Sequence, residues 1–109
     1  NMNEEETVKR EKEIDRGNKA KAILDSEIFQ ESFTAVRADY MESWEKSTLD
    51  DSDKREKIWM MVAHLDDVKS HIVSVLQTGL MSQQQLADIP SIKPSFEEDS
   101  GRLRTFLGG

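Results

Sequence analysis

Apolar residues recur at helical spacing over two long stretches of the chain. Over residues 53–78 they alternate at steps of three and four, which places them on one side of an α-helix. The members of this seam are Ile58, Met61, Leu65, Val68, Ile72 and Val75. Over residues 26–46 similar steps separate Phe29, Phe33, Val36, Tyr40 and Trp44. The pattern therefore predicts two amphipathic helices, and Gly79 stands where the second would end.

The polar segment 47–52 joins the two predicted helices. A connection of this length makes consecutive helices antiparallel neighbours, so we expect a helical hairpin. Asp53, followed three residues later by Glu56, has the spacing of an N-terminal capping pair and marks the expected start of the second helix. Trp44 and Trp59 fall near the turn and are expected to close it. The predicted hairpin core consists of Phe29, Phe33, Val36, Tyr40, Trp44 and Trp59.

Outside the hairpin the pattern is weaker. Residues 1–17 are rich in Glu, Lys and Arg and predict a polar N-terminal helical arm, and the helix is expected to restart at Asn18 after Gly17. The hairpin domain is assigned to 18–89. It includes a short helix near 82–88, with Ser82 and Gln85 at capping-box spacing and Pro90 as its stop.

Residues 90–109 predict an extended tail, because they contain two prolines, several serines and an acidic run. Near its end, apolar and basic residues alternate in a pattern typical of a partner-docking peptide. These residues are Arg102, Leu103, Phe106 and Leu107. The fold class expected for the whole chain is all-α.

The composition favours association. Of the 109 residues, 36% are hydrophobic and 34% are charged. A single copy therefore has little apolar surface to offset the entropy of ordering its chain. The seam of the second helix is also wider than one partner helix covers. We therefore expect a homo-oligomer whose subunits meet at the seam.

Charge is unevenly distributed within the net −7. Residues 25–53 carry nine acidic groups against Arg37 and Lys46, a surface suited to a basic partner or to solvent. Rows of carboxylates also allow an alternative function, an acidic inhibitor that mimics nucleic acid on a host enzyme. The N-terminal arm carries the candidate nucleic-acid contacts Lys9, Arg10, Lys12, Arg16, Lys19 and Lys21. A helical DNA-binding regulator is a further alternative, although six interleaved acids favour ion pairs along the helix.

Signals of chemistry are sparse. The sequence has no cysteine, no phosphate-binding glycine loop and no nucleophile motif, so we expect neither enzymatic activity nor a cofactor. His64, Asp67 and His71 share a helical face, but a metal site needs further ligands, and none is expected. No apolar stretch is long enough to span a bilayer. The chain is expected to be soluble and cytoplasmic, without a membrane partner.

One resemblance covers residues 18–86. The order Phe29-x3-Phe33-x6-Tyr40-x3-Trp44, then Arg55-Glu56-x2-Trp59, then Leu65-x2-Val68-x2-His71-Ile72-x2-Val75-x2-Thr78-Gly79 resembles short helical proteins of tailed-bacteriophage head and packaging genes. Within that group, the small terminase subunit is the member with a defined role. The resemblance implies a non-enzymatic, oligomerising adaptor for head assembly or DNA packaging that engages a larger packaging protein through its tail. It also implies a location in the host-cell cytoplasm or in the virion. Small terminases usually carry an N-terminal helix-turn-helix, and residues 1–24 lack its pattern.

Overall fold

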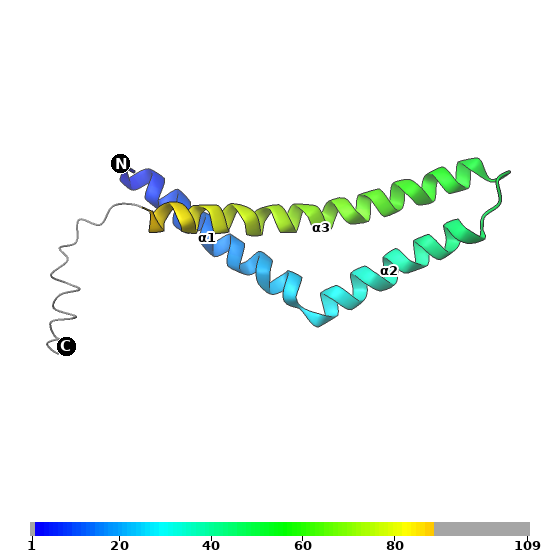
Figure 1. The fold of residues 1–109 in the computed structure, drawn as a ribbon, viewed down its shortest axis with the longest axis horizontal. Helices are drawn as coiled ribbons and strands as arrows, with labels where there is room; N and C mark the ends of the chain where they lie inside the picture. Colours follow the sequence, from blue (N-terminus) through cyan, green and yellow to red (C-terminus); the bar gives the residue numbers. More distant parts are fainter. Residues whose placement is uncertain (1, 89–109) are drawn as a thin grey trace, which may run out of the picture.

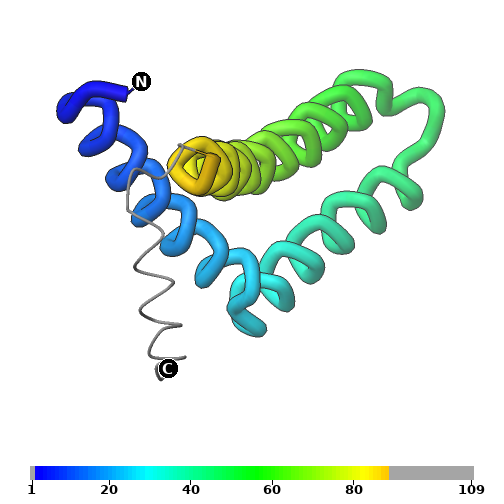
Figure 2. The backbone as a smooth tube through the Cα atoms, turned by 60° about the vertical axis from the view of Figure 1, so that its left-hand side comes forward, coloured from blue at the N-terminus to red at the C-terminus, as the bar shows by residue number. Residues whose placement is uncertain are grey.

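The computed structural model describes residues 2–88, which form three α-helices (Figure 1). Helix α1 spans Glu4–Asp25, α2 spans Glu27–Lys46 and α3 spans Ser52–Ala87. The expected all-α class is confirmed for this part of the chain. Helices α1 and α2 form a V whose two arms meet the opposite ends of α3 (Figure 1). Seen nearly along α3, α1 crosses close to the C-terminal end of that helix (Figure 2).

Helix α1 is one uninterrupted element. Asn3 caps it, because its Oδ1 accepts a hydrogen bond from the backbone N–H of Glu6 at 2.7 Å. Such a cap satisfies an N–H that has no partner within the helix, and three glutamates in the first turn favour the positive end of the helix dipole. The expected break at Gly17 and restart at Asn18 were wrong, since the helix continues through both residues. Gly17 is buried against α3, so tertiary packing outweighs its low helix propensity.

Ser26 alone separates α1 from α2. Its backbone is extended (φ −66°, ψ 128°), and its N–H donates to the carbonyl oxygen of Ile23 at the end of α1. Its side-chain oxygen accepts from the N–H of Phe29 at 3.2 Å, which caps the start of α2. One residue therefore ends one helix, begins the next and sets the bend between them.

Helix α3 is longer than the sequence pattern indicated. It covers 36 residues. At the usual rise per residue this corresponds to a length of about 54 Å. The separate short helix near 82–88 was a wrong prediction, because the helix does not end at Gly79. The N-cap is Asp51 rather than Asp53, and it makes no side-chain capping bond.

Helices α2 and α3 run antiparallel on either side of the turn at residues 47–51 (Figure 1). Arg55 in the first turns of α3 reaches back across this connection. Its Nη1 donates to the backbone oxygen of Ser47 at 3.1 Å and to the Ser47 hydroxyl at 3.0 Å. Its guanidinium carbon lies 3.8 Å from the centre of the Trp44 ring. This is a cation–π contact. Both helices of the predicted hairpin are therefore present, with α1 added at the far end.

The buried interior of the described residues is small. Only Ala20, Ile58 and Val62 are buried apolar side chains, and Ser82 is buried with them. Most large apolar side chains of residues 2–88 therefore stay in contact with solvent in a single copy. None of the described helices combines the length and apolar content that crossing a bilayer requires.

Candidate interaction surfaces

Helices α1 and α3 cross with their backbones in contact at Gly17 and Gly79. A Cβ atom built on Gly79 would lie 2.8 Å from the backbone oxygen of Glu13 and 2.9 Å from Cα of Gly17. Real side chains do not approach backbone atoms so closely. One turn further along each helix stand Ala20 and Ser82, both buried. The crossing therefore needs small residues on both helices.

Polar bonds lock the same crossing. The hydroxyl of Ser82, which is fully buried, donates a hydrogen bond to Oε1 of Glu13. Arg10 joins them, with Nη1 3.4 Å from Oε1 of Glu13 and 3.5 Å from Oγ of Ser82. The Ser82 bond is the main reason that the pKa of Glu13 lies below its ordinary value, and the nearby charges of Lys9 and Arg10 lower it further. Nε of Arg10 is buried and bonds to no other described residue.

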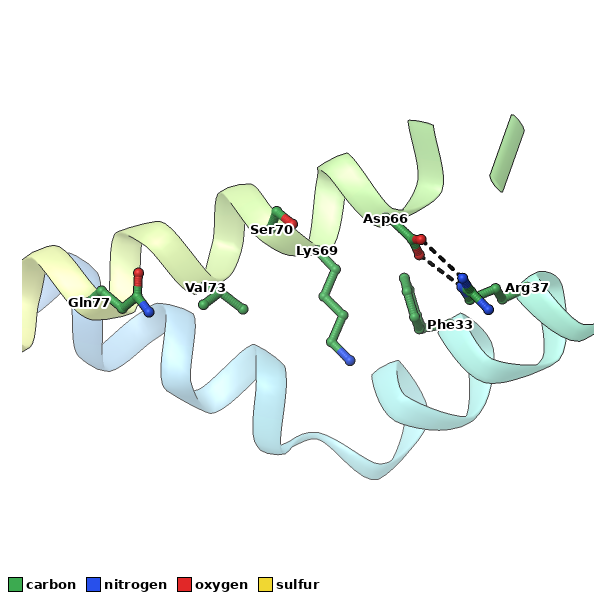
Figure 3. Close-up of a pocket in the computed structure, with 7 residues that line it drawn as sticks. All are labelled: Phe33, Arg37, Asp66, Lys69, Ser70, Val73 and Gln77. Atoms are coloured by element: carbon green, nitrogen blue, oxygen red, sulfur yellow. Dashed lines mark hydrogen bonds and ion pairs between the residues drawn. The ribbon is translucent and has the colours of Figure 1, made fainter. Parts of the chain in front are cut away.

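The other end of α3 is held by larger side chains. Arg37 of α2 forms a two-pronged ion pair with Asp66, with Nε 2.9 Å from Oδ1 and Nη2 3.2 Å from Oδ2 (Figure 3). The hydrogen bonds from Arg37 lower the pKa of Asp66. Lys69 places its Nζ 4.6 Å from the centre of the Phe33 ring. Helix α2 is thus attached by charged and aromatic contacts at the surface.

These residues line an open depression of about 600 Å³ between α2 and α3 (Figure 3). Its wall continues along α3 through Ser70, Val73 and Gln77. Two of the charged groups that line it, Arg37 and Asp66, already satisfy each other. The depression is therefore shallow, and its Arg37 and Asp66 charges are already neutralised by each other.

The residues of the predicted α3 seam differ in how far they are buried in the structure. Ile58 is buried, with 7% of its surface exposed. Leu65, Ile72 and Val75 are half-buried. Met61 and Val68 remain exposed, at 43% and 60%. Because Met61, Leu65, Val68 and Ile72 stand at steps of four, three and four, they form one line along α3, which we call the α3 ridge.

A groove begins where the α3 ridge meets α1. Its volume is about 200 Å³, and its apolar lining consists of Ala20, Ile23, Ile72 and Val75. Arg16 and Lys19 of α1 and His71 of α3 complete the lining. The groove thus combines an apolar base with basic side chains on two helices. We call it the α1–α3 groove.

The predicted hairpin core is only partly covered. Phe29, Phe33, Tyr40 and Trp44 are half-buried, and the Phe29 and Phe33 rings stack with centres 6.2 Å apart. Val36 is 39% exposed and Trp59 is 62% exposed. Trp59 therefore does not close the turn end as expected. Its place is taken by Arg55, whose guanidinium covers Trp44.

The six N-terminal cations do not share one surface. Arg10 points into the α1–α3 crossing, and Lys21 pairs with Asp25 at 2.6 Å on another side of α1. The remaining four are exposed and follow one face of the helix at steps of three, four and three. They are Lys9, Lys12, Arg16 and Lys19.

Two other expectations concern chemistry and docking. Within residues 2–88 no group of three His, Cys, Asp or Glu side chains is arranged to hold a metal ion, so His64, Asp67 and His71 do not form such a cluster. The predicted docking residues Arg102, Leu103, Phe106 and Leu107 lie outside the described residues.

Comparison with protein-family models, with curated proteins and with solved structures gives no significant match to the chain in any of the three.

The α1–α3 crossing, where the backbones meet at Gly17 and Gly79, was not predicted from the sequence. A signal for it exists in the sequence. Gly17 is followed by Ala20, and Gly79 by Ser82, so each helix carries two small residues one turn apart on one face. Such pairs allow helices to approach closely, and the presence of one pair in each of two predicted helices marks where they can cross.

Proposed function

We propose that the protein is a non-enzymatic assembly component that associates with copies of itself through the α3 ridge. The observation that carries this proposal is the exposure of Met61 and Val68 on a line that continues the buried contacts of α3. The class of assembly favoured by the sequence resemblance is the head or DNA-packaging machinery of tailed bacteriophages, where small helical adaptors form oligomers.

The small interior supports association. Only three apolar side chains of residues 2–88 are buried, whereas large ones such as Val68, Trp59 and Met81 are each at least 60% exposed. Covering a large apolar side chain contributes about 1.5–3 kcal/mol, so a second copy on the α3 ridge would add stability that one copy lacks. The ridge spans eleven residue steps along the helix. These steps amount to about 16 Å, which is the length of a short helix–helix contact.

The character of the exposed surfaces of the described chain also supports this role. Polar side chains bind other parts of the same chain, as in the Arg37–Asp66 ion pair and the Glu13–Ser82 hydrogen bond. The α3 ridge, in contrast, is apolar and elongated, and two of its four side chains lie in solvent. Surfaces of that kind serve protein–protein contact more often than small-molecule binding.

The test is the solution mass of matched variants. Met61→Glu with Val68→Glu places two charges on the α3 ridge and should shift the mass measured by light scattering toward a single protomer, with circular dichroism unchanged. Leu49→Glu is the control, because Leu49 is 87% exposed in the turn and away from the ridge. A wild-type chain that remains a single protomer at high concentration would refute the proposal, and so would an oligomer that is indifferent to the ridge variants.

A further inference from the structure

Two exposed stripes of opposite charge run along the arms of the V. On α1, four cations and one isoleucine recur at steps of three, four, three and four, so they lie on one face. This basic stripe consists of Lys9, Lys12, Arg16, Lys19 and Ile23. On α2, steps of three, four, four and three define an acidic stripe of Ile28, Glu31, Ala35, Asp39 and Glu42. All ten side chains are exposed.

The two stripes match when one is reversed. Each spans fourteen residue steps. That distance is about 21 Å of helix. Placed antiparallel with Ile23 opposite Ile28, the basic stripe brings Lys12 to Asp39 and Lys9 to Glu42. Lys19 falls one residue step from Glu31, within reach of a long side chain, and Arg16 meets the small side chain of Ala35. Three of the four cations thus lie at or next to a carboxylate, and the isoleucines meet at one end.

Within one chain these stripes do not meet. Helix α1 is fixed on α3 by the Gly17–Gly79 contact, and α2 is fixed on α3 by Arg37 and Asp66. Among residues 2–88 no ion pair joins α1 to α2. Lys9, Lys12 and Arg16 pair with no described carboxylate. Lys19 of the basic stripe contacts Asp15 at 3.1 Å and Glu42 of the acidic stripe contacts Lys46 at 3.0 Å, each along its own helix. Most of the charge on the basic stripe is therefore free to meet another molecule.

The α1–α3 groove gives the pairing an apolar anchor. Ile28 is 69% exposed at the start of α2 and Ile23, which lines the groove, is 46% exposed. In the antiparallel register Ile28 of another molecule comes to Ile23 at the mouth of this groove. The groove base, including Ile72 and Val75, is then covered by an apolar side chain while Arg16 and Lys19 stay beside the acidic stripe.

We propose that the basic stripe of α1 binds the acidic stripe of α2 from a second copy of this chain, antiparallel and with Lys12 opposite Asp39. The occupant is a second copy because both halves of a matching pair are present on the same sequence. The two stripes have equal length, and four of their five positions lie at the same distances from the isoleucine. The contact rests on the proposed self-association and adds to it a charged surface distinct from the α3 ridge.

Disulfide trapping tests the register directly, because the natural sequence has no cysteine. One full-length chain carries Lys12→Cys, and a second, distinguished by a size tag, carries Asp39→Cys. Mixed and mildly oxidised, they should form the mixed disulfide faster than either chain forms a disulfide with itself. The control partner is Thr34→Cys, exposed on another face of α2, which should trap little.

Two outcomes of the trapping experiment overturn the proposal. The first is trapping at Thr34 as efficient as at Asp39, which would mean random collision. The second comes from the doubly substituted chain carrying both cysteines. If dilute samples form the bond within a single chain, the stripes close on themselves and need no second copy.

Charge reversal supplies an independent readout by sedimentation. Lys12→Glu and Asp39→Lys should each weaken association roughly tenfold, since each loses a surface pair and creates a repulsion, and the double variant should recover most of the loss. Loss of association in the ridge variants with no effect of either reversal would overturn the stripe contact and leave the proposed function intact. A wild-type chain that never associates would overturn both. Salt-sensitive binding of duplex DNA that depends on Lys12, without trapping between chains, would assign the basic stripe to nucleic acid instead.

Discussion

The two ends of α3 are held by contacts of opposite character. At the C-terminal end, α1 lies backbone to backbone on α3 at Gly17 and Gly79, and the buried Ser82 hydroxyl bonds to Glu13. In the N-terminal half of α3, α2 is attached by the Arg37–Asp66 pair and by Lys69 over the Phe33 ring, and much of the α2 surface stays exposed. The first contact depends on the absence of side chains, and the second depends on large ones.

This difference predicts different tolerance to substitution. A contact made by backbones has no flexible atoms that could yield, so any added carbon displaces a whole helix. A contact made by long, half-exposed side chains can adjust its rotamers or take up water. We therefore expect sharp effects at the α1–α3 crossing and graded ones in the α2–α3 hairpin.

The largest effect is expected for Gly79→Ala. In an exposed helix this change would stabilise by up to about 1 kcal/mol, because alanine has the higher helix propensity. Here the new Cβ would press on backbone atoms of Glu13 and Gly17. The strain should reverse the sign to a loss of about 2 kcal/mol in the free energy of unfolding. Urea unfolding followed by circular dichroism, at one fixed protein concentration, measures it.

Thr78→Ala is the control for that experiment, because Thr78 is exposed on the same helix one residue away. It should leave the free energy of unfolding within about 0.5 kcal/mol of the wild type. A stabilised Gly79→Ala variant would show that α1 does not lie on α3 at this distance.

A smaller effect is expected for Ile58→Val in the hairpin. Ile58 is 7% exposed. Removing one methylene there should cost about 1 kcal/mol in the free energy of unfolding. Trp59→Ala provides the contrast on the adjacent position, which is 62% exposed. At this position a change within about 0.5 kcal/mol is expected. A larger loss at Trp59 than at Ile58 would mean that α2 covers a different face of α3.

The smallest effect is expected from pH. The folded pKa values of Glu13 and Asp66 lie below their ordinary values of 4.5 and 3.8. The stability from each group is therefore present above these ordinary values and is lost as the pH falls through the folded pKa. The free energy of unfolding should decline only in acid, as the pH falls below 4.5. Urea unfolding repeated across this range measures the decline.

Two variants separate the contributions of the two ends to this decline. Ser82→Ala should raise the pKa of Glu13 and leave that of Asp66 unchanged, because the Ser82 hydroxyl is the main cause of the first shift alone. Arg37→Gln should do the reverse. Carboxyl resonances in NMR titrations report each pKa, and a shift of both groups in either variant would contradict the independence of the two contacts.

The hairpin was largely predictable because its signals are local. The aromatic spacing and Ser26 gave α2 within one residue of its observed start, and the polar turn gave its end. The core was harder to predict. The apolar spacing of one helix does not show which of its sides a neighbouring helix will cover. Trp59 was predicted to lie in the hairpin core, although it is on the uncovered side of α3.

The α1–α3 crossing escaped prediction because it is a contact between distant residues. Gly17 and Gly79 look like helix breakers when only their neighbours in the sequence are considered. The sequence therefore predicted a break in α1 at Gly17 and an end of α3 at Gly79, whereas both helices continue through these residues. Their actual role appears only when both helices are placed together. Arg10 and Lys21 are a different case, because helical spacing alone places them off the face of the basic stripe.

The reach of Arg55 has a practical consequence for the turn between α2 and α3. Since this side chain bonds to Ser47 and covers Trp44 at the end of α2, it joins the two helices directly, without the help of residues 48–50. The tip itself, with Leu49 almost wholly in water, contributes little to keeping them aligned. Residues 48–50 are therefore a suitable site for inserting a label or an epitope, because an insertion there leaves the Arg55 contacts between α2 and α3 in place.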